Sequence, residues 1–169
     1  MLFYFGVGLS NQSLHALTDY LFRYEYSKEL MGTQFRILLY AKDSTMAASA
    51  AEAGFNRVAE LELIFSDYLE ASEASTLGST AGMGGPQKVS REMWRVLTAA
   101  LEVSQLSDGA FDVSIGALTK LWRKAFRQNK LPEPAEINDA LATTGYKAIR
   151  LNYKSQTIEV TLPGMRLDF

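Results

Sequence analysis

The sequence predicts an α+β protein, with one strand near the start, several helices in the middle and a sheet-like tail. Apolar residues alternate with polar ones over residues 34–41, recur at steps of three and four over 46–126, and alternate again over 148–169. Of 169 residues, 47% are apolar or aromatic and 21% are charged, a balance typical of a soluble globular chain with a buried core. No linker or repeat divides the chain into two large domains.

The strand predicted over residues 34–41 has two distinct faces. Phe35, Ile37 and Leu39 share one face, and polar side chains such as Arg36 lie on the other. We therefore expect the Phe35 face to pack against the rest of the protein.

A long helix is predicted from Met46 to about Tyr68, because Asp43 and its neighbours supply capping chemistry just before it. Its small and apolar residues form one stripe, which we expect to be buried. The stripe comprises Ala47, Ala50, Ala51, Gly54, Val58, Leu61, Phe65 and Tyr68. Gly54 is expected either to weaken the helix locally or to let a neighbour approach closely.

Three shorter helices are predicted downstream. The first is capped by Ser90 and ends near Leu106, and the other two span about 117–126 and 135–143. The inner faces of the first two should include Val96, Leu97, Ala100, Val103, Leu118, Leu121, Trp122 and Phe126. Residues 76–86 are predicted to form a loop, and their glycines are not followed by the Gly-Lys-Ser/Thr of a phosphate-binding P-loop.

The tail is predicted to form three strands. Residues 148–151 and 157–162 should pair as a hairpin across the turn at 152–156, and residues 165–169 read as a further strand. The last segment has no polar end or turn, so the chain reads as one that stops within a strand.

Composition excludes several kinds of chemistry. There is no Cys, which excludes disulfides, thiolate metal sites and cysteine nucleophiles. The single histidine, His15, excludes a His-rich metal cluster and argues against a Ser-His-Asp triad. A net charge of −2 gives no basic footprint for nucleic acid. Carboxylates, hydroxyls, backbone groups or a bound cofactor must therefore supply any chemistry.

The N-terminal 23 residues have little pattern. The apolar run Met1–Leu9 is far shorter than the roughly 20 residues of a membrane span. No basic residue precedes Arg23, so a clear signal peptide is absent. Two readings remain for residues 1–23, a loose arm or a degraded export signal, and the patterned domain is taken as 24–169.

Three short segments are candidates for a ligand site. They are Met31-Gly32-Thr33 before the strand, Phe65–Tyr68 followed by the polar run 72–75, and the compact turn 107–116. Each also has a purely structural reading, as a strand entry, a helix end or a capped turn. A basic helical face formed by Lys120, Arg123, Lys124 and Arg127 is expected to be solvated or to contact a partner.

Taken together and in order, these segments resemble the N-terminal half of the ApbE family, the FAD:protein FMN transferases. The resemblance spans roughly residues 24–169 and rests on several motifs in register. They are Met31-Gly-Thr-Gln-Phe-Arg-Ile37, Phe65-Ser-Asp-Tyr68, Ser72–Leu77, Val89-Ser90, Ser107-Asp-Gly-Ala-Phe-Asp112, Gly116-Ala-Leu118, Leu121-Trp122, Gly145-Tyr146 and Leu167-Asp168.

The resemblance implies a tunnelling-fold (T-fold) α+β domain, truncated here after its N-terminal half. It also implies FAD contacts at positions that match the family motifs. These positions are Met31, Tyr68, Ala110, Phe111, Asp112 and Asp168.

The reaction implied is Mg²⁺-dependent. A Thr or Ser hydroxyl of a target flavoprotein attacks the FMN-side phosphorus of FAD, and AMP leaves. Such phosphoryl transfer depends on positioning and charge neutralisation more than on a protein nucleophile. The implied partners are FAD and an exported or membrane flavoprotein, and the implied location is the outer face of the cytoplasmic membrane or the periplasm.

The sequence also departs from the family pattern. A Gly-Gly-Ile-Ala-Lys-Gly-like stretch usually follows the Leu167-Asp168 pair, and the Mg²⁺ ligands come later; neither is in this sequence, nor is a lipobox Cys. No metal ligand and no catalytic residue is therefore assigned within the chain. The alternative reading is a non-catalytic FAD-binding remnant or an inactive fragment.

Overall fold

The computed structural model describes residues 20–169, and residues 1–19 of the predicted N-terminal arm lie outside the described part. The fold is α+β, as the sequence predicts. Its elements in chain order are β1 (Phe22–Leu30), β2 (Thr33–Ala41), α1 (Ser44–Phe65), α2 (Glu73–Ser79), β3 (Gln87–Lys88), α3 (Arg91–Leu106), α4 (Gly116–Gln128), α5 (Pro134–Ala142), a 3₁₀ turn (Tyr146–Ala148), β4 (Ile149–Asn152) and β5 (Thr157–Val160). None of the helices within residues 20–169 is long and apolar enough to cross a bilayer.

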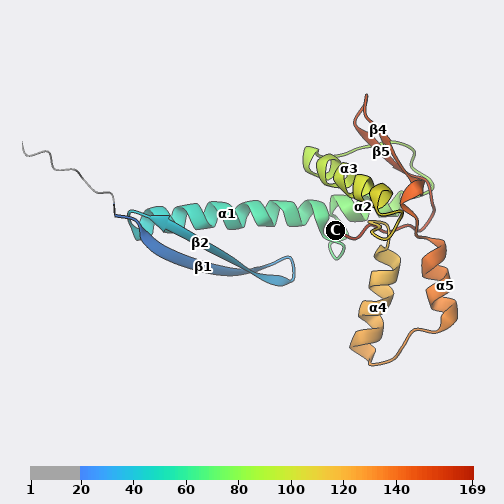
Figure 1. Ribbon diagram of the computed structural model, residues 1–169, viewed down its shortest axis with the longest axis horizontal. Coiled ribbons are helices and arrows are strands. Elements are labelled where there is room, and N and C mark those ends of the chain that lie inside the picture. The colour runs from blue at the N-terminus through green and yellow to red at the C-terminus, as the bar shows by residue number, and fades with distance from the viewer. Residues whose placement is uncertain (1–19) are drawn as a thin grey trace, which may run out of the picture.

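The molecule is elongated, with α1 as its axis (Figure 1). The antiparallel hairpin β1–β2 lies along the N-terminal part of α1, and the remaining elements gather at the other end of the helix. We call this second region, residues 66–169, the body. Helices α4 and α5 pack against each other and extend from the body as a pair. The C-terminus returns to the junction between α1 and the body, where Phe169 packs edge-on against Phe65 with ring centroids 5.2 Å apart.

The hairpin confirms the predicted faces of β2 and adds a strand that the sequence pattern did not reveal. Phe35, Ile37 and Leu39 are the half-buried positions of β2, and they alternate with exposed ones. Gly54 of α1 faces this strand, and a Cβ there would lie only 2.7 Å from Ile37 Cδ1. The glycine therefore allows the close approach that was one of its two predicted roles.

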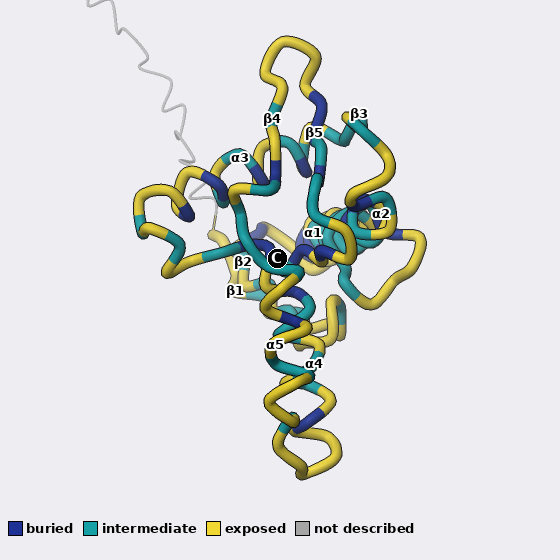
Figure 2. The backbone as a smooth tube through the Cα atoms, turned by 90° about the vertical axis from the view of Figure 1, so that its right-hand side faces the viewer, coloured by how far each residue is buried: buried dark blue, intermediate teal, exposed yellow. Residues whose placement is uncertain are grey.

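The body has its own hydrophobic core (Figure 2). A three-stranded antiparallel sheet of order β3-β5-β4 contributes Ile158 and Val160, α3 contributes Met93 and Leu97, and the tail contributes Met165. The predicted hairpin of residues 148–162 is confirmed, because β4 pairs with β5 in register.

Several helical predictions need correction. Residues 76–79 belong to α2 rather than to a loop, because the buried Ser72 caps a helix whose Ala74 and Leu77 reach the core. The long helix ends at Phe65, not near Tyr68.

The predicted buried faces are also partly wrong. Ala50 is exposed, whereas Phe55, which lay outside the predicted stripe, is buried. On α3, Val96 and Val103 are exposed, and the buried positions are Met93, Leu97, Leu101 and Ser104. The buried stripes thus lie slightly to one side of the positions that the apolar spacing predicted.

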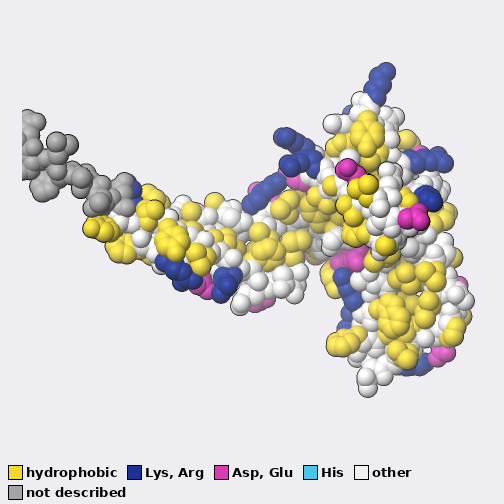
Figure 3. Space-filling model, viewed as in Figure 1, with side chains coloured by type: hydrophobic (Ala, Val, Ile, Leu, Met, Phe, Trp, Pro, Cys, Tyr) yellow, Lys and Arg dark blue, Asp and Glu magenta, His cyan; other side chains and the backbone are white. Residues whose placement is uncertain are grey.

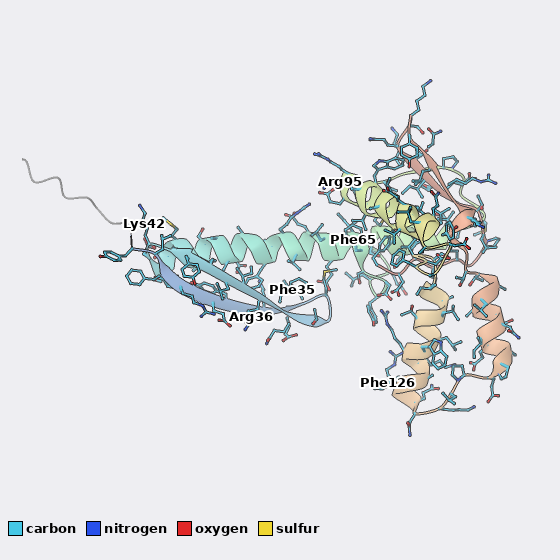
Figure 4. All side chains as sticks on the ribbon, viewed as in Figure 1. Phe35, Arg36, Lys42, Phe65, Arg95 and Phe126 are labelled. Carbon is cyan, nitrogen blue, oxygen red and sulfur yellow. The ribbon has the colours of Figure 1, made fainter. Side chains whose placement is uncertain are left out.

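Trp122 and Phe126 of α4 are not core residues. They are 48% and 87% exposed, and Phe126 lies toward the far end of the helix (Figure 4). Hydrophobic side chains accordingly lie on the surface over the α4 and α5 pair (Figure 3). Helix α4 packs on α5, and an ion pair between Lys124 and Glu136 (3.2 Å) joins the two helices.

The predicted third strand of the tail is reduced to a single parallel bridge between Arg166 and Ile115. Two backbone bonds flank it, from Gly116 N–H to Arg166 O (3.1 Å) and from Asp168 N–H to Val113 O (2.9 Å). The tail therefore runs in extended form beside the loop that opens α4.

Candidate functional site

A groove of about 570 Å³ lies where the end of α1, α2, α4 and the tail meet. Two of the three candidate segments, residues 65–75 and 107–116, contribute to this region, although they are far apart in the chain. Its lining residues are Asp67, Tyr68, Glu70, Ala74, Ser75, Gly78, Ser79, Gly116, Lys120, Arg123, Arg127, Gly164, Met165, Arg166 and Leu167.

The groove carries an excess of positive charge. Four basic side chains line it, against the two carboxylates of Asp67 and Glu70. Three of the basic residues come from α4, one helical turn or less apart, so they point to the same side of the helix. Such a lining suits a ligand with more than one negative charge.

Glycine at position 116 brings the tail against α4. A Cβ there would lie 2.8 Å from the carbonyl oxygen of Leu167, closer than real side-chain atoms come. Only glycine lets these backbones lie so close, and that contact forms one wall of the groove.

Arg123 is the most connected side chain of the groove. Its guanidinium forms an ion pair with Asp67, lies 3.5 Å from an oxygen of Asp168, and sits over the ring of Tyr68 at 5.1 Å from the centroid. Partial burial lowers the pKa of Arg123, but the hydrogen bond to Asp67 and the charges of Asp67 and Asp168 outweigh it and raise the pKa above its ordinary value. Arg123 is therefore a permanent cation between two carboxylates.

Asp168 is fixed from two more directions. Thr119 Oγ1 donates a hydrogen bond of 2.7 Å to its carboxylate, and its own N–H donates to Val113 O. These bonds tie the tail both to α4 and to the loop that carries Asp112. Tyr68, by contrast, is 70% exposed, so most of its ring area is open to a ligand.

Asp112 organises the loop before α4. Its Oδ1 accepts hydrogen bonds from the N–H and the hydroxyl of Ser114 (2.8 and 2.6 Å), and its Oδ2 accepts the N–H of Tyr146 (2.9 Å). The Ser114 hydroxyl in turn accepts the N–H of Gly145 (2.7 Å). Asp112 thus joins two segments more than 30 residues apart in the chain.

Ala110 and Phe111, the other predicted contacts in this loop, are exposed. The N–H of Phe111 is bonded to Ser107 Oγ (3.0 Å), which fixes the backbone while the ring remains accessible. An exposed aromatic side chain on a fixed backbone can contact a flat ligand at low entropic cost.

Met31 lies in the β1–β2 turn, with a left-handed backbone angle of φ 50°. Its N–H donates to Glu62 Oε1 in the last turn of α1 (3.1 Å), which anchors the hairpin tip to the helix that leads to Tyr68. No hydrogen bond or ring contact links Met31 directly to the other predicted residues within the described part of the chain. Of the predicted contacts, Tyr68 lines the groove and Asp168 forms an ion pair with Arg123 of its wall. The loop that carries Asp112 reaches the groove through Gly116, whereas Met31 is not among the lining residues.

Sequence reasoning missed Arg123 and Thr119 as members of this site. Arg123 was assigned with Lys120, Lys124 and Arg127 to a basic face, although its side chain is an ion-paired part of the groove wall. The serines at 66, 72 and 75 prove to be structural, because Ser72 Oγ donates to Ser66 O and accepts the N–H of Ser75. Residues 20–169 contain no group of three or more His, Cys, Asp or Glu placed to hold a metal ion.

Comparison with known proteins gives a consistent answer. The family model described as the ApbE family matches residues 31–169. An FAD:protein FMN transferase from Klebsiella pneumoniae is 32% identical over 149 residues, which cover 86% of this chain and 44% of that protein. The corresponding protein from Treponema pallidum is 29% identical, over 85% of this chain and 42% of that protein.

Solved structures agree. The ApbE protein of Thermotoga maritima superposes with a TM-score of 0.74 at 28% identity, covering 86% of this chain and 47% of that one. The flavin transferase ApbE from Vibrio cholerae gives a TM-score of 0.75 at 24% identity and supports the fold alone. The chain spans somewhat less than half the length of the relatives it matches. The α+β architecture expected from the sequence is the one that these structures share over the matched residues. Since the family model covers most of its residues, this chain belongs to the ApbE family.

Proposed function

We propose that the protein transfers FMN from FAD to a Thr or Ser hydroxyl of a flavoprotein and releases AMP. The observation that carries this proposal is the cationic groove, because Tyr68 lines it and Asp168 forms an ion pair with Arg123 of its wall. Relatives over the same residues are named FAD:protein FMN transferases.

The groove has the chemistry that FAD requires. The diphosphate of FAD is a dianion, and Lys120 and Arg166 offer cationic side chains to it. The flat rings of FAD can stack on the exposed Tyr68. In this arrangement the chain binds and orients the donor, which is the main requirement of phosphoryl transfer.

The reaction proposed is a displacement at phosphorus. The acceptor hydroxyl loses its proton and forms a P–O bond to the FMN phosphate, while the bond to the AMP phosphate breaks. Basic groove side chains stabilise the negative charge that AMP carries away.

Mg²⁺ is part of the proposal, but residues 20–169 do not form a site for it. The carboxylates of Asp112 and Asp168 are already bonded to Ser114, Tyr146, Thr119 and Arg123. We therefore expect the ion to be held by other ligands, and no step is derived through it. Mg²⁺ would supply charge neutralisation at the phosphates.

We further propose that the acceptor is an exported or membrane flavoprotein and that the protein works in the cell envelope. This part of the proposal rests on the family resemblance alone.

The test is to incubate the intact protein with FAD, Mg²⁺ and a flavoprotein acceptor, and to measure AMP release and covalent flavin fluorescence on the acceptor. We expect both signals, and we expect chelation of Mg²⁺ to abolish them. The Tyr68→Ala variant should raise the KM for FAD, whereas Tyr40→Ala, which removes another exposed tyrosine from β2, should not. FAD binding without AMP release would instead support the non-catalytic alternative.

A further inference from the structure

Arg123 occupies the point where three separate segments of the groove meet. Asp67 follows α1, Arg123 lies in the middle of α4, and Asp168 lies in the tail, so the ion pairs span 56 and 45 positions along the chain. No other described basic side chain of the groove forms more than one ion pair.

The burial of these groups sets them apart from ordinary surface pairs. The side chains of Arg123, Asp67 and Asp168 retain only 36, 30 and 21% of their exposure. Exposed ion pairs add little to stability, but partly buried ones with hydrogen bonds fix geometry more firmly. If the guanidinium were removed, the carboxylates of Asp67 and Asp168 would lose the counter-charge that they share.

The guanidinium also orients an aromatic ring. It lies over Tyr68 at 5.1 Å from the ring centroid, within the range of a cation–π interaction. Tyr68 comes after the end of α1 and is 70% exposed, so Arg123 is the contact that restrains its otherwise open ring.

We infer that Arg123 is a positioning residue for the flavin nucleotide: it holds Tyr68 and Asp168 in the orientation in which they meet the ligand. The inference rests on the proposed function, because it concerns the same groove and the same ligand. It assigns Arg123 a role that acts through Tyr68 and Asp168 rather than through its own contact with FAD. Charge alone cannot perform this role, because a lysine lacks the planar fork that serves a ring and two carboxylates together.

Arg127 provides a matched control. It lies one helical turn further along α4 and lines the same groove, yet it has no ion pair with any residue in the described range 20–169. Its substitution removes the same charge from the groove without disturbing Tyr68 or Asp168.

The experiment titrates FAD into the intact protein and into the variants Arg123→Met, Arg123→Lys and Arg127→Met, following the quenching of flavin fluorescence. We expect Arg123→Met to weaken FAD binding by about tenfold or more, and Arg127→Met by clearly less. Arg123→Lys should restore the charge but only part of the affinity. In turnover assays, Arg123→Lys should raise the KM for FAD with little change in kcat.

A double-mutant cycle separates positioning from direct contact. In a Tyr68→Ala and Asp168→Asn background, Arg123→Met should cause almost no further loss of affinity, because the groups it positions are gone. A full additional loss would mean that Arg123 contacts FAD itself and would overturn the inference. Equal losses from Arg123→Met and Arg127→Met would overturn it as well.

Arg123→Lys serves as the control for loss of folding, because it keeps a positive charge between the two carboxylates. If Arg123→Met does not fold, the Arg123→Lys variant provides the test. An FAD affinity and a KM equal to those of the wild type in Arg123→Lys would overturn the inference. A weaker affinity with an unchanged melting temperature would support it. Absence of FAD binding by the wild-type protein would overturn the proposed function and this inference together, whereas normal wild-type binding with unaffected Arg123 variants overturns only the inference.

Discussion

The body and the hairpin end of the molecule differ in how many apolar residues they bury. In the body, twelve buried residues from helices, sheet and tail form one cluster. In the hairpin and the helix beside it, the buried residues are Ala41, Ala47, Ala51 and Phe55, and Leu38 and Tyr40 of β2 stay exposed. A two-stranded hairpin with so little buried apolar surface has marginal stability of its own.

The difference shows which end can fix a ligand site. Arg123, Asp112 and Asp168 are bonded to elements that the core of the body holds in place. Met31 is attached only through the tip of the hairpin and its bond to Glu62. We therefore expect the body to hold a preformed groove and the hairpin to open locally at a lower free energy.

The largest loss of stability should come from the centre of the body. Leu97→Ala removes a fully buried side chain, and we expect it to lower the free energy of unfolding by about 2–5 kcal/mol. Urea denaturation followed by circular dichroism measures the change. Val96→Ala, one position along α3 and 41% exposed, is the control. A similar effect of both substitutions would contradict the existence of a distinct core in the body.

Asp112→Ala should have the next largest effect. It leaves the N–H groups of Ser114 and Tyr146 without their acceptor, at a cost of about 1–3 kcal/mol for a buried donor. The same variant should weaken FAD binding, because the loop loses its attachment. Asp139→Ala, on the exposed side of α5, serves as the control in thermal unfolding and FAD titration. Wild-type behaviour of Asp112→Ala would show that the loop is held by other contacts.

Phe55→Ala tests the weaker end. Phe55 is buried between α1 and the hairpin, where Lys28 lies over its ring at 5.9 Å. We expect faster amide hydrogen exchange in β1 and β2, with almost unchanged exchange in α3 and β5. The reason is that the substitution removes contacts that hold the hairpin on α1, and the hairpin can open without unfolding of the body. Equal acceleration in the body would mean that hairpin and body unfold as one cooperative unit.

The smallest change in stability is expected at the contact between α5 and α4. A backbone hydrogen bond from Glu133, together with the side-chain hydrogen bond and charge of Lys124, holds the pKa of Glu136 below its ordinary value of 4.5. The ionised form is therefore the stabilising one, and its contribution is present above pH 4.5 and is lost as pH falls through the lower, folded-state pKa. Glu136→Gln should be slightly less stable than the wild type at neutral pH. The difference should shrink in acid, as thermal unfolding at several pH values will show.

The regular elements of the body were predictable because their local signals agree with their packing. Ser90 caps α3 where the sequence places it, and the alternation around residue 152 gives the β4–β5 hairpin. Strand β1 was missed because the alternation of Phe22, Tyr24 and Tyr26 with polar residues is short and gives way to the polar run 27–29. None of its nine residues is fully buried. Pairing with β2 over all nine residues holds it in the strand conformation.

The site was predictable in part. The resemblance selected Tyr68, Asp112 and Asp168, and the structure brings the segments that carry them to one groove, although their ligand remains a prediction. Arg123 could not be distinguished from Lys120 or Arg127 by spacing, because all three occupy one side of α4. Only the fold shows that Asp67 and Asp168 converge on Arg123, since neither is near it in the chain. Apolar spacing likewise could not show that Trp122 faces outward.

That outward tryptophan gives the protein an optical probe beside its groove. The chain has two tryptophans: Trp94 packs edge-on against Tyr153 in the body, while the half-exposed Trp122 neighbours Arg123 on α4. Flavins accept excitation energy from indole, so binding of a flavin in the groove should quench the fluorescence of Trp122 in particular. With Trp94 replaced by Phe, the remaining fluorophore would follow occupancy of the groove in real time, without a label.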